Sequence, residues 1–193
     1  MSVGRSDHVL ETDRLRLAMP QPGDESSICR YLVTNRAHLE SMGPARPDEF
    51  YTETHWAQRI PDMVEQHEQG AAARFFVYLL DAPGEIIGQA NLFHIARESF
   101  QCATLGYGVA EAHQGRGFAT EACEAVVRFA FDELNIHRVQ AGHLPENLAS
   151  AAVLRKLGFV PEGYARDFLC FHGRWRDHVL TARVNPDWKD PDA

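Results

Sequence analysis

Long hydrophobic runs are missing from this 193-residue chain, and no stretch approaches the roughly 18 consecutive apolar residues that would cross a bilayer. The N-terminal segment also lacks the apolar core of a secretory signal peptide. We therefore expect a cytoplasmic protein with no membrane partner.

Positive charge is scarce as well, since 19 Lys and Arg face 27 Asp and Glu, for a formal net charge of −8. This balance disfavours nucleic acid as a direct partner and suits a cationic substrate, although it serves solubility equally well.

The four cysteines form no C-x-x-C pair and no His/Cys cluster with zinc spacing, so we expect no metal. Cys102, Cys123 and Cys170 lie in apolar stretches and are predicted to be reduced core residues.

The length suits a single domain, residues 1–193, with loose termini at 1–10 and 186–193. Hydrophobic periodicity and turn signals predict the following elements in order: strand 14–19, helices 25–40 and 53–69, strands 75–80, 85–95 and 102–109, a helix from 118, strand 137–144, helix 147–157, and strands 164–171 and 175–182. The order predicts an α+β fold with a mixed, largely antiparallel seven-stranded sheet. Strands 102–109 and 137–144 should be parallel, because a helix connects them.

The most informative segment is a glycine loop between strand 102–109 and an alanine-rich amphipathic helix. Free backbone N–H groups and the helix dipole at such a junction suit a pyrophosphate. Gly115 and Gly117 allow close approach, because glycine has no Cβ. A plain turn is the competing interpretation, and Arg116 could equally be a solvated loop residue. The spacing is neither GxxxxGK[ST] nor GxGxxG, which excludes the usual P-loop and dinucleotide motifs.

The loop spacing is Gln114-x-x-Gly117-x-Ala119, which resembles the Q/R-x-x-G-x-G/A loop of the GNAT acetyltransferase family. A second element, Asn147-x-x-Ser150 followed by Gly158-Phe159, resembles the N-x-x-S/A…GF element of the same family. Asn147 also fits a helix N-cap, and Gly158 a helix C-cap.

The resemblance extends over residues 11–188 and points to the RimJ/RimL subfamily, in particular the RimJ type. The segment Glu11–Leu17 carries it, as does Gly163-Tyr164 followed by Gly173–Leu180. The part most specific to the RimJ type is Gly173–Thr181 followed by Pro186-Asp187-Trp188. The resemblance implies a GNAT fold with helices on both faces of the sheet and a splay between the fourth and fifth strands. It also implies acetyl-CoA as cosubstrate and direct acetyl transfer, through a tetrahedral intermediate, to the N-terminal alanine of a ribosomal protein.

The resemblance further implies the site residues. Backbone N–H groups of Tyr107, Gly108 and Val109 would orient the acetyl group and stabilise the oxyanion. Asn147 would hold the pantetheine arm, and Ser150 would protonate the leaving thiolate, although Ser150 equally fits an ordinary first-turn serine. The pyrophosphate would be held by the loop residues Gln114, Gly115, Arg116, Gly117, Phe118, Ala119 and Thr120.

Two catalytic side chains of the family are missing. The position of the glutamate base is Gly142, and that of the tyrosine acid is Leu154. The base is left open between a water chain, Glu98 and His143. Deprotonating an α-amine, with a pKa near 7.8, costs roughly 3.5 kcal/mol less at neutral pH than deprotonating a lysine near 10.4, so the missing carboxylate favours an α-amine acceptor.

Three alternatives for the function follow. The first is N-terminal acetylation, with a small first residue in a pocket near Phe93 and aromatic residues of the first two helices. The second keeps the fold and acetylates a polyamine, amino sugar or amino acid, and the third is an acetyl-CoA-binding module without turnover. The oligomeric state is not set by the sequence.

Overall fold

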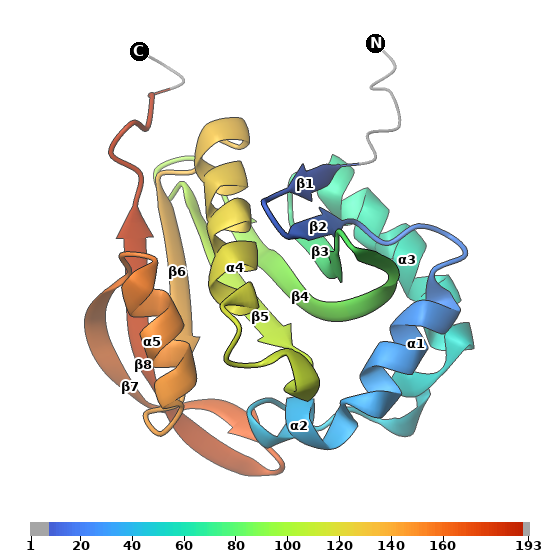
Figure 1. Ribbon diagram of the computed structural model, residues 1–193. Coiled ribbons are helices and arrows are strands. Elements are labelled where there is room, and N and C mark those ends of the chain that lie inside the picture. The colour runs from blue at the N-terminus through green and yellow to red at the C-terminus, as the bar shows by residue number, and fades with distance from the viewer. Residues whose placement is uncertain (1–7, 191–193) are drawn as a thin grey trace.

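The computed structural model describes residues 8–190. Its strands and helices are drawn in Figure 1. The strands are β1 Val9–Glu11, β2 Leu15–Ala18, β3 Ala73–Leu79, β4 Ala82–Ala96, β5 Cys102–Val109, β6 Arg138–His143, β7 Val160–Phe171 and β8 Arg174–Val184. The α-helices are α1 Glu25–Thr34, α2 Arg36–Ser41, α3 Glu53–Glu68, α4 Phe118–Arg128 and α5 Leu148–Lys156.

All eight strands form one sheet in the order β1-β2-β3-β4-β5-β6-β8-β7. The pair β5–β6 is parallel, whereas every other adjacent pair of the described chain is antiparallel. The predicted α+β architecture and the parallel crossover are therefore confirmed. The strand count is eight instead of seven because β1 pairs with β2, and three residues are too few to show an alternating pattern.

The chain ends are more ordered than predicted within the described part. Residues 9 and 10 belong to β1, not to a loose segment. Near the C-terminus, the Asn135 side chain bonds to the backbone of Lys189 in both directions, at 2.7 and 3.2 Å. The Trp188 ring packs edge-on against His137 at 5.5 Å. These contacts attach residues 188 and 189 to the domain, whereas the predicted loose segments 1–7 and 191–193 lie outside the described residues.

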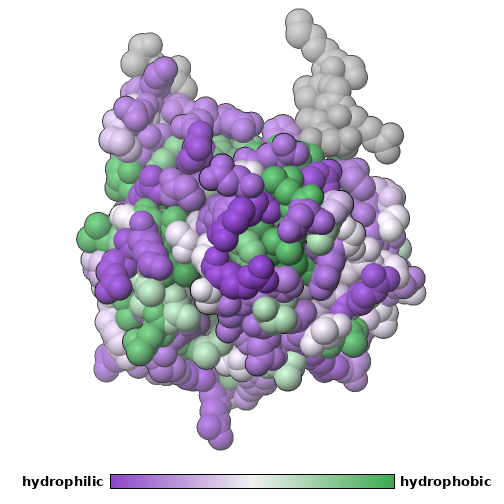
Figure 2. All heavy atoms as spheres, viewed as in Figure 1, coloured by the Kyte–Doolittle hydropathy of each residue, from purple (hydrophilic) through white to green (hydrophobic). Residues whose placement is uncertain are grey.

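Helices cover both faces of the sheet (Figure 1). On one face, here the α4–α5 face, α4 and α5 pack on a core that includes Ala103, Leu105, Val139 and Ala141 of the two parallel strands. On the opposite α1–α3 face, α1 and α3 pack on a smaller core. Figure 2 shows a largely hydrophilic surface with separated hydrophobic patches, as expected for a domain with its own buried core.

Several helix ends follow their predicted signals. Thr52 caps α3, its hydroxyl accepting a bond from the His55 amide at 3.3 Å, and α3 continues through Pro61. The single helix expected over 25–40 is divided into α1 and α2 at Asn35, whose side-chain amide donates to the Tyr31 carbonyl at 2.9 Å. Asp24 precedes α1, but its carboxylate accepts from the Gln21 amide and not from the helix.

The cysteine prediction holds for Cys102 and Cys123, which are buried, and Cys29 is buried too. It is wrong for Cys170, which is exposed. Cys170 lies on the edge strand β7, where an apolar neighbourhood in sequence does not imply cover by a helix.

The two parallel strands separate along their length. They pair only at Cys102↔Arg138, Ala103↔Val139 and Thr104↔Gln140. Beyond that point β5 stays paired with β4 and β6 with β8, so a gap opens between β5 and β6, visible in Figure 1 as two diverging arrows. The predicted splay is confirmed. No helix within residues 8–190 is long and apolar enough to span a membrane.

Candidate active site

The gap leaves one edge of β5 open. Residues Leu105–Val109 pair with β4 on one side and with no strand on the other. Because N–H and C=O groups of a strand alternate between its two edges, part of this backbone faces the gap. The open edge runs along Tyr107, Gly108 and Val109, and their role as donors to an acyl oxygen stays a prediction.

The glycine loop follows directly from β5. Gly115 and Gly117 have φ values of +70° and +83°, a region that favours glycine. Gly117 is the N-cap of α4, and the Glu121 amide donates to its carbonyl at 3.1 Å. The amides of Phe118, Ala119 and Thr120 thus precede the first helical hydrogen bond and have no acceptor within the helix. The loop presents these donors at the positive end of the α4 dipole, which suits an anion.

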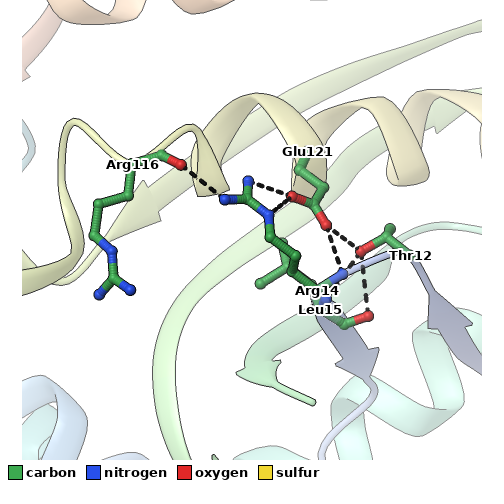
Figure 3. A network of polar contacts seen from close by, with 5 residues as sticks. All are labelled: Thr12, Arg14, Leu15, Arg116 and Glu121. Carbon is green, nitrogen blue, oxygen red and sulfur yellow. Dashed lines mark hydrogen bonds and ion pairs between the residues drawn. The ribbon is translucent and has the colours of Figure 1, made fainter. Parts of the chain in front are cut away.

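Arg14 ties this loop to the N-terminal strands, as Figure 3 shows. Its Nε donates to Glu121 Oε2 at 2.7 Å, and its Nη1 donates to the Arg116 carbonyl at 3.1 Å. The Thr12 hydroxyl donates to Glu121 Oε1 at 2.6 Å, and the Arg14 amide to the same oxygen at 3.0 Å. The network fixes the Arg116 peptide, and through it the direction of the loop.

The charges of this network lie at the loop itself. Burial alone would raise the pKa of Glu121, but hydrogen bonds from Thr12 and Arg14 outweigh it and hold the pKa below its usual range. Glu121 is therefore ionised at neutral pH and offsets Arg14. The guanidinium carbons of Arg14 and Arg116 lie 4.6 and 4.8 Å from the Phe118 ring centroid, within cation–π range. The Arg116 side chain is therefore held against Phe118 at the end of the loop. The sequence alone did not identify Arg14 as part of this site.

A groove of about 700 Å³ continues from the loop between the start of α4 and the end of α5. Its lining includes Gly117 and Thr120 on one side and Lys156 and Gly158 on the other. Gly158 follows α5 with a φ of +76°, as its predicted role in ending this helix requires. The groove is contiguous with the loop, so a ligand bound at the loop can extend into it.

Tyr107 crosses the gap on the α4–α5 face and meets the first turn of α5. Its hydroxyl lies 2.7 Å from Ser150 Oγ and donates to the Ser150 carbonyl at 3.3 Å. Burial raises the pKa of Tyr107, which therefore remains a neutral hydroxyl at physiological pH. Sequence reasoning used only the backbone of Tyr107. Leu154, one turn after Ser150, is buried in the core.

Asn147 caps α5 as predicted, because its Oδ1 accepts from the Ser150 amide at 3.0 Å. The cap fixes the turn that carries Ser150. Its role in holding a ligand stays a prediction, as do the ligand roles of the loop residues.

We expect Asn147→Ala to lower the free energy of unfolding by about 1 kcal/mol, or about 2–4 °C in melting temperature, through loss of the cap. CoA affinity should fall as well, because the site loses an amide. Thr52→Ala is the matched control, since it removes the cap of α3 away from the gap. The Thr52→Ala variant should lose a similar free energy of unfolding and keep its CoA affinity. Equal CoA affinities for the two variants would show that Asn147 only caps α5 and does not bind CoA.

Glu98 and His143, the two side chains considered as the general base, lie in different positions relative to the β5–β6 gap. Glu98 precedes β5 at the end opposite to Val109, about 25 Å away along an eight-residue strand, so the structure does not bring it to the gap. His143 lies at the gap end of β6 but faces α5, where it lines a cavity of about 420 Å³ with Leu154 and Phe159. Its Nδ1 lies 2.9 Å from the Leu144 carbonyl.

The α1–α3 face of the gap has a glycine floor. A Cβ at Gly106 would lie 2.7 Å from Cε2 of Phe93, and one at Gly108 would lie 3.4 Å from Cδ2 of Leu39. Phe93 therefore packs on this floor, and its role in lining a pocket for the acceptor stays a prediction. Leu39 of α2 packs on the floor at Gly108. The aromatic residues Tyr31 and Trp56 do not line the floor, because they are buried in the α1–α3 core. Among residues 8–190, no group of three or more His, Cys, Asp or Glu side chains could hold a metal ion.

A splayed parallel pair beside a glycine loop at a helix N-terminus defines the class of the protein as an acetyltransferase of the GNAT fold. Residues 14–160 match the acetyltransferase (GNAT) domain family, and the chain belongs to this family.

The chain is similar to enzymes of the RimJ/RimL group. It is 38% identical over 179 residues to the [ribosomal protein uS5]-alanine N-acetyltransferase of Escherichia coli K12, covering 93% of this chain and 92% of that protein. The solved ribosomal-protein-S5-alanine acetyltransferase of Vibrio fischeri superposes with a TM-score of 0.91 at 34% identity, over 95% of this chain and 100% of that one. RimJ of Mycobacterium smegmatis, solved with CoA-disulfide, gives 0.84 at 26% identity, over 95% and 88%. The resemblance predicted from the motifs is confirmed.

Proposed function

We propose that the protein transfers the acetyl group of acetyl-CoA to the α-amine of a protein N-terminus, specifically an N-terminal alanine of a ribosomal protein. One observation carries the proposal: β5 and β6 stop pairing after Thr104↔Gln140, and different groups border the resulting gap on the two faces of the sheet. On the α4–α5 face it meets Tyr107, Ser150 and the glycine loop, and on the α1–α3 face it meets the Gly106–Gly108 floor. A thioester and an amine can thus approach from opposite sides.

The residues present fit CoA. The left-handed Gly115 and Gly117 carry no side chain at these two positions of the loop, and no protein atom lies within 4 Å of a Cβ position at Gly115. The free amides of the first α4 turn would hold the pyrophosphate, and the contiguous groove with Lys156 would take the remainder of the nucleotide. Acetyl-CoA supplies the acetyl thioester. Arg14 and Glu121 do not need to touch it, because they fix the loop.

The chemistry follows from three groups of this chain. Backbone N–H groups at Tyr107–Val109 would stabilise negative charge on the acyl oxygen. Asn147 would hold the pantetheine arm beside the gap. Ser150 would give a proton to the leaving sulfur, and the Tyr107 hydroxyl, 2.7 Å from Ser150 Oγ, would hold the serine hydroxyl in place beside the gap.

The α-amine acceptor is supported by the missing carboxylate at Gly142 and by the relatives, two of which are alanine N-acetyltransferases of a small-subunit ribosomal protein. The narrow floor between Phe93 and Leu39 suits a small first residue. The net charge of −8 complements a basic polypeptide.

With an alanyl peptide as acceptor, kcat/KM should rise with pH through a pKa near the α-amine value of about 7.8 and then level off. The rise follows because only the neutral amine attacks. The measurement is a pH series with a peptide that begins with alanine, compared with the same peptide N-terminally blocked and with spermidine. A higher kcat/KM for spermidine than for any alanyl peptide would replace this proposal with the small-amine alternative.

A further inference from the structure

His178 of β8 is a buried histidine that the proposed function does not use. It lies on the α1–α3 face of the sheet, beside Gly142 of β6. Gly142 faces this side, because side chains alternate along a strand and its neighbour Ala141 belongs to the α4–α5 core. A Cβ at Gly142 would lie 3.6 Å from Cδ2 of His178 and 3.6 Å from Cδ2 of Leu180. The imidazole of His178 and the Leu180 side chain, both on β8, therefore share the space over the position where the family resemblance implies a carboxylate.

The surroundings of His178 fix both its orientation and its tautomer. The side chain is 4% exposed, and the rings of Phe168 and Phe171 lie 5.4 and 5.6 Å from its own. Its Nδ1 lies 3.1 Å from the Arg176 carbonyl, which only accepts, so Nδ1 carries the hydrogen. In the neutral imidazole Nε2 is then the acceptor, and residues 8–190 give it no hydrogen-bond partner.

The register places this group beside the gap. Thr104↔Gln140 is the last pair of the parallel strands, and the Gln140 side chain donates to Thr104 Oγ1 at 3.1 Å, closing this end of the gap. Two residues further on, Gly106 and Gly142 lie on opposite sides of the opening and face the same side of the sheet. An amine that enters over the glycine floor therefore has Gly106 on one side and His178 on the other.

We propose that His178 is the general base of the acetyl transfer, taking the proton of the acceptor amine directly or through one water. The inference rests on the proposed function. As the bond between amine nitrogen and acetyl carbon forms, the N–H proton passes to Nε2. As the carbon–sulfur bond breaks, the sulfur gains the Ser150 proton, which Tyr107 and solvent restore. The imidazolium returns its proton to solvent, so protons balance over one turnover.

Few charges face the imidazole. From β7 it meets Phe168 and Phe171, and from β6 it meets the glycine. Nearby charged groups already have partners: Asp177 accepts from the Tyr164 hydroxyl and from the Asp167 amide, and Arg176 pairs with Glu146. The charges of Arg166 and of His178 itself add to these bonds in lowering the pKa of Asp177. The base candidate thus lies between two aromatic rings, with one carboxylate nearby.

The test compares His178→Gln with His143→Gln, a matched pair of buried histidines on opposite faces of the sheet near the gap. With an alanyl peptide at pH 7, His178→Gln should lower kcat/KM by about 100-fold, a usual contribution of a general base, with CoA affinity unchanged. At pH 9.5 the loss should shrink to a few-fold, because the more concentrated hydroxide can take this proton in place of the imidazole. Added imidazole should restore part of the activity of His178→Ala, and His143→Gln should remain close to the wild type.

Three results would overturn the proposal: a loss in His178→Gln that is equal at both pH values, wild-type activity in this variant, or the pH-dependent loss in His143→Gln instead. His178→Asn retains a donor for the Arg176 carbonyl and serves if the glutamine variant is unstable. A measurement without any variant is the ¹⁵N spectrum of the wild type, where a hydrogen on Nε2 in place of Nδ1 also contradicts the assignment. If the wild-type protein acetylated no alanyl peptide, the proposed function itself would be refuted. That result is distinguishable from the three results that would overturn only the role of His178.

Discussion

Gly117→Val is expected to weaken CoA binding at least tenfold, which corresponds to about 1.4 kcal/mol. Gly117 has a φ of +83°, and a β-branched residue there is strained by about 1–3 kcal/mol. Its Cβ would lie 3.4 Å from Arg14 Nη2, so the added methyl groups crowd the network that fixes the loop. They also occupy the space in front of the free amides of the first α4 turn, where the phosphate oxygens must lie.

Calorimetry with CoA measures this effect directly. Gly70→Val is the matched control, because Gly70 is also left-handed, with a φ of +68°, and follows α3 away from the gap. It should lose stability and keep its CoA affinity. A folded Gly117→Val protein that binds CoA as tightly as the wild type would contradict the assignment of the loop.

Ser150→Ala should lower kcat about 100-fold with little change in KM, because the proton is needed only when sulfur leaves. Tyr107→Phe removes the hydroxyl 2.7 Å from Ser150 Oγ and should lower kcat in the same direction. Since the two hydroxyls are proposed to act as one unit, the double variant should be no worse than Ser150→Ala by more than a few-fold.

Tyr78→Phe controls for the loss of a buried tyrosine hydroxyl, since Tyr78 lies on β3 and burial raises its pKa to about 12. It should retain full kcat. Product release could mask a slower chemical step in Ser150→Ala, and a single-turnover experiment removes this ambiguity. A normal single-turnover rate in Ser150→Ala would show that Ser150 is not the proton donor.

The predictable parts of the site are those with local causes. The loop Gln114–Thr120 and the cap at Asn147 could be predicted because glycine conformation and capping depend on neighbours in sequence. The splay followed from the family resemblance, and the structure has it at the expected pair of strands. Most strands were located to within a few residues, since alternation is a local signal.

The missed parts depend on partners far apart in sequence. Arg14 and Glu121 are separated by 107 residues, and Tyr107 and Ser150 by 43, so no local pattern joins them. The proposed role of His178 has no local signal either, because it depends on β8, not β7, lying beside β6, which brings His178 over Gly142. Cys170 was misassigned for a related reason, because hydrophobicity does not reveal which strand becomes the sheet edge.

The central claim is that the β5–β6 gap joins a thioester on one face to an α-amine on the other. The most direct test is tandem mass spectrometry of a peptide that begins with alanine and contains an internal lysine, after incubation with the protein and acetyl-CoA. We predict one added acetyl group, located on the alanine nitrogen, in a product that Gly117→Val forms far more slowly. An acetyl group on the lysine side chain, or an unmodified peptide under conditions where the wild type binds CoA, would contradict the account.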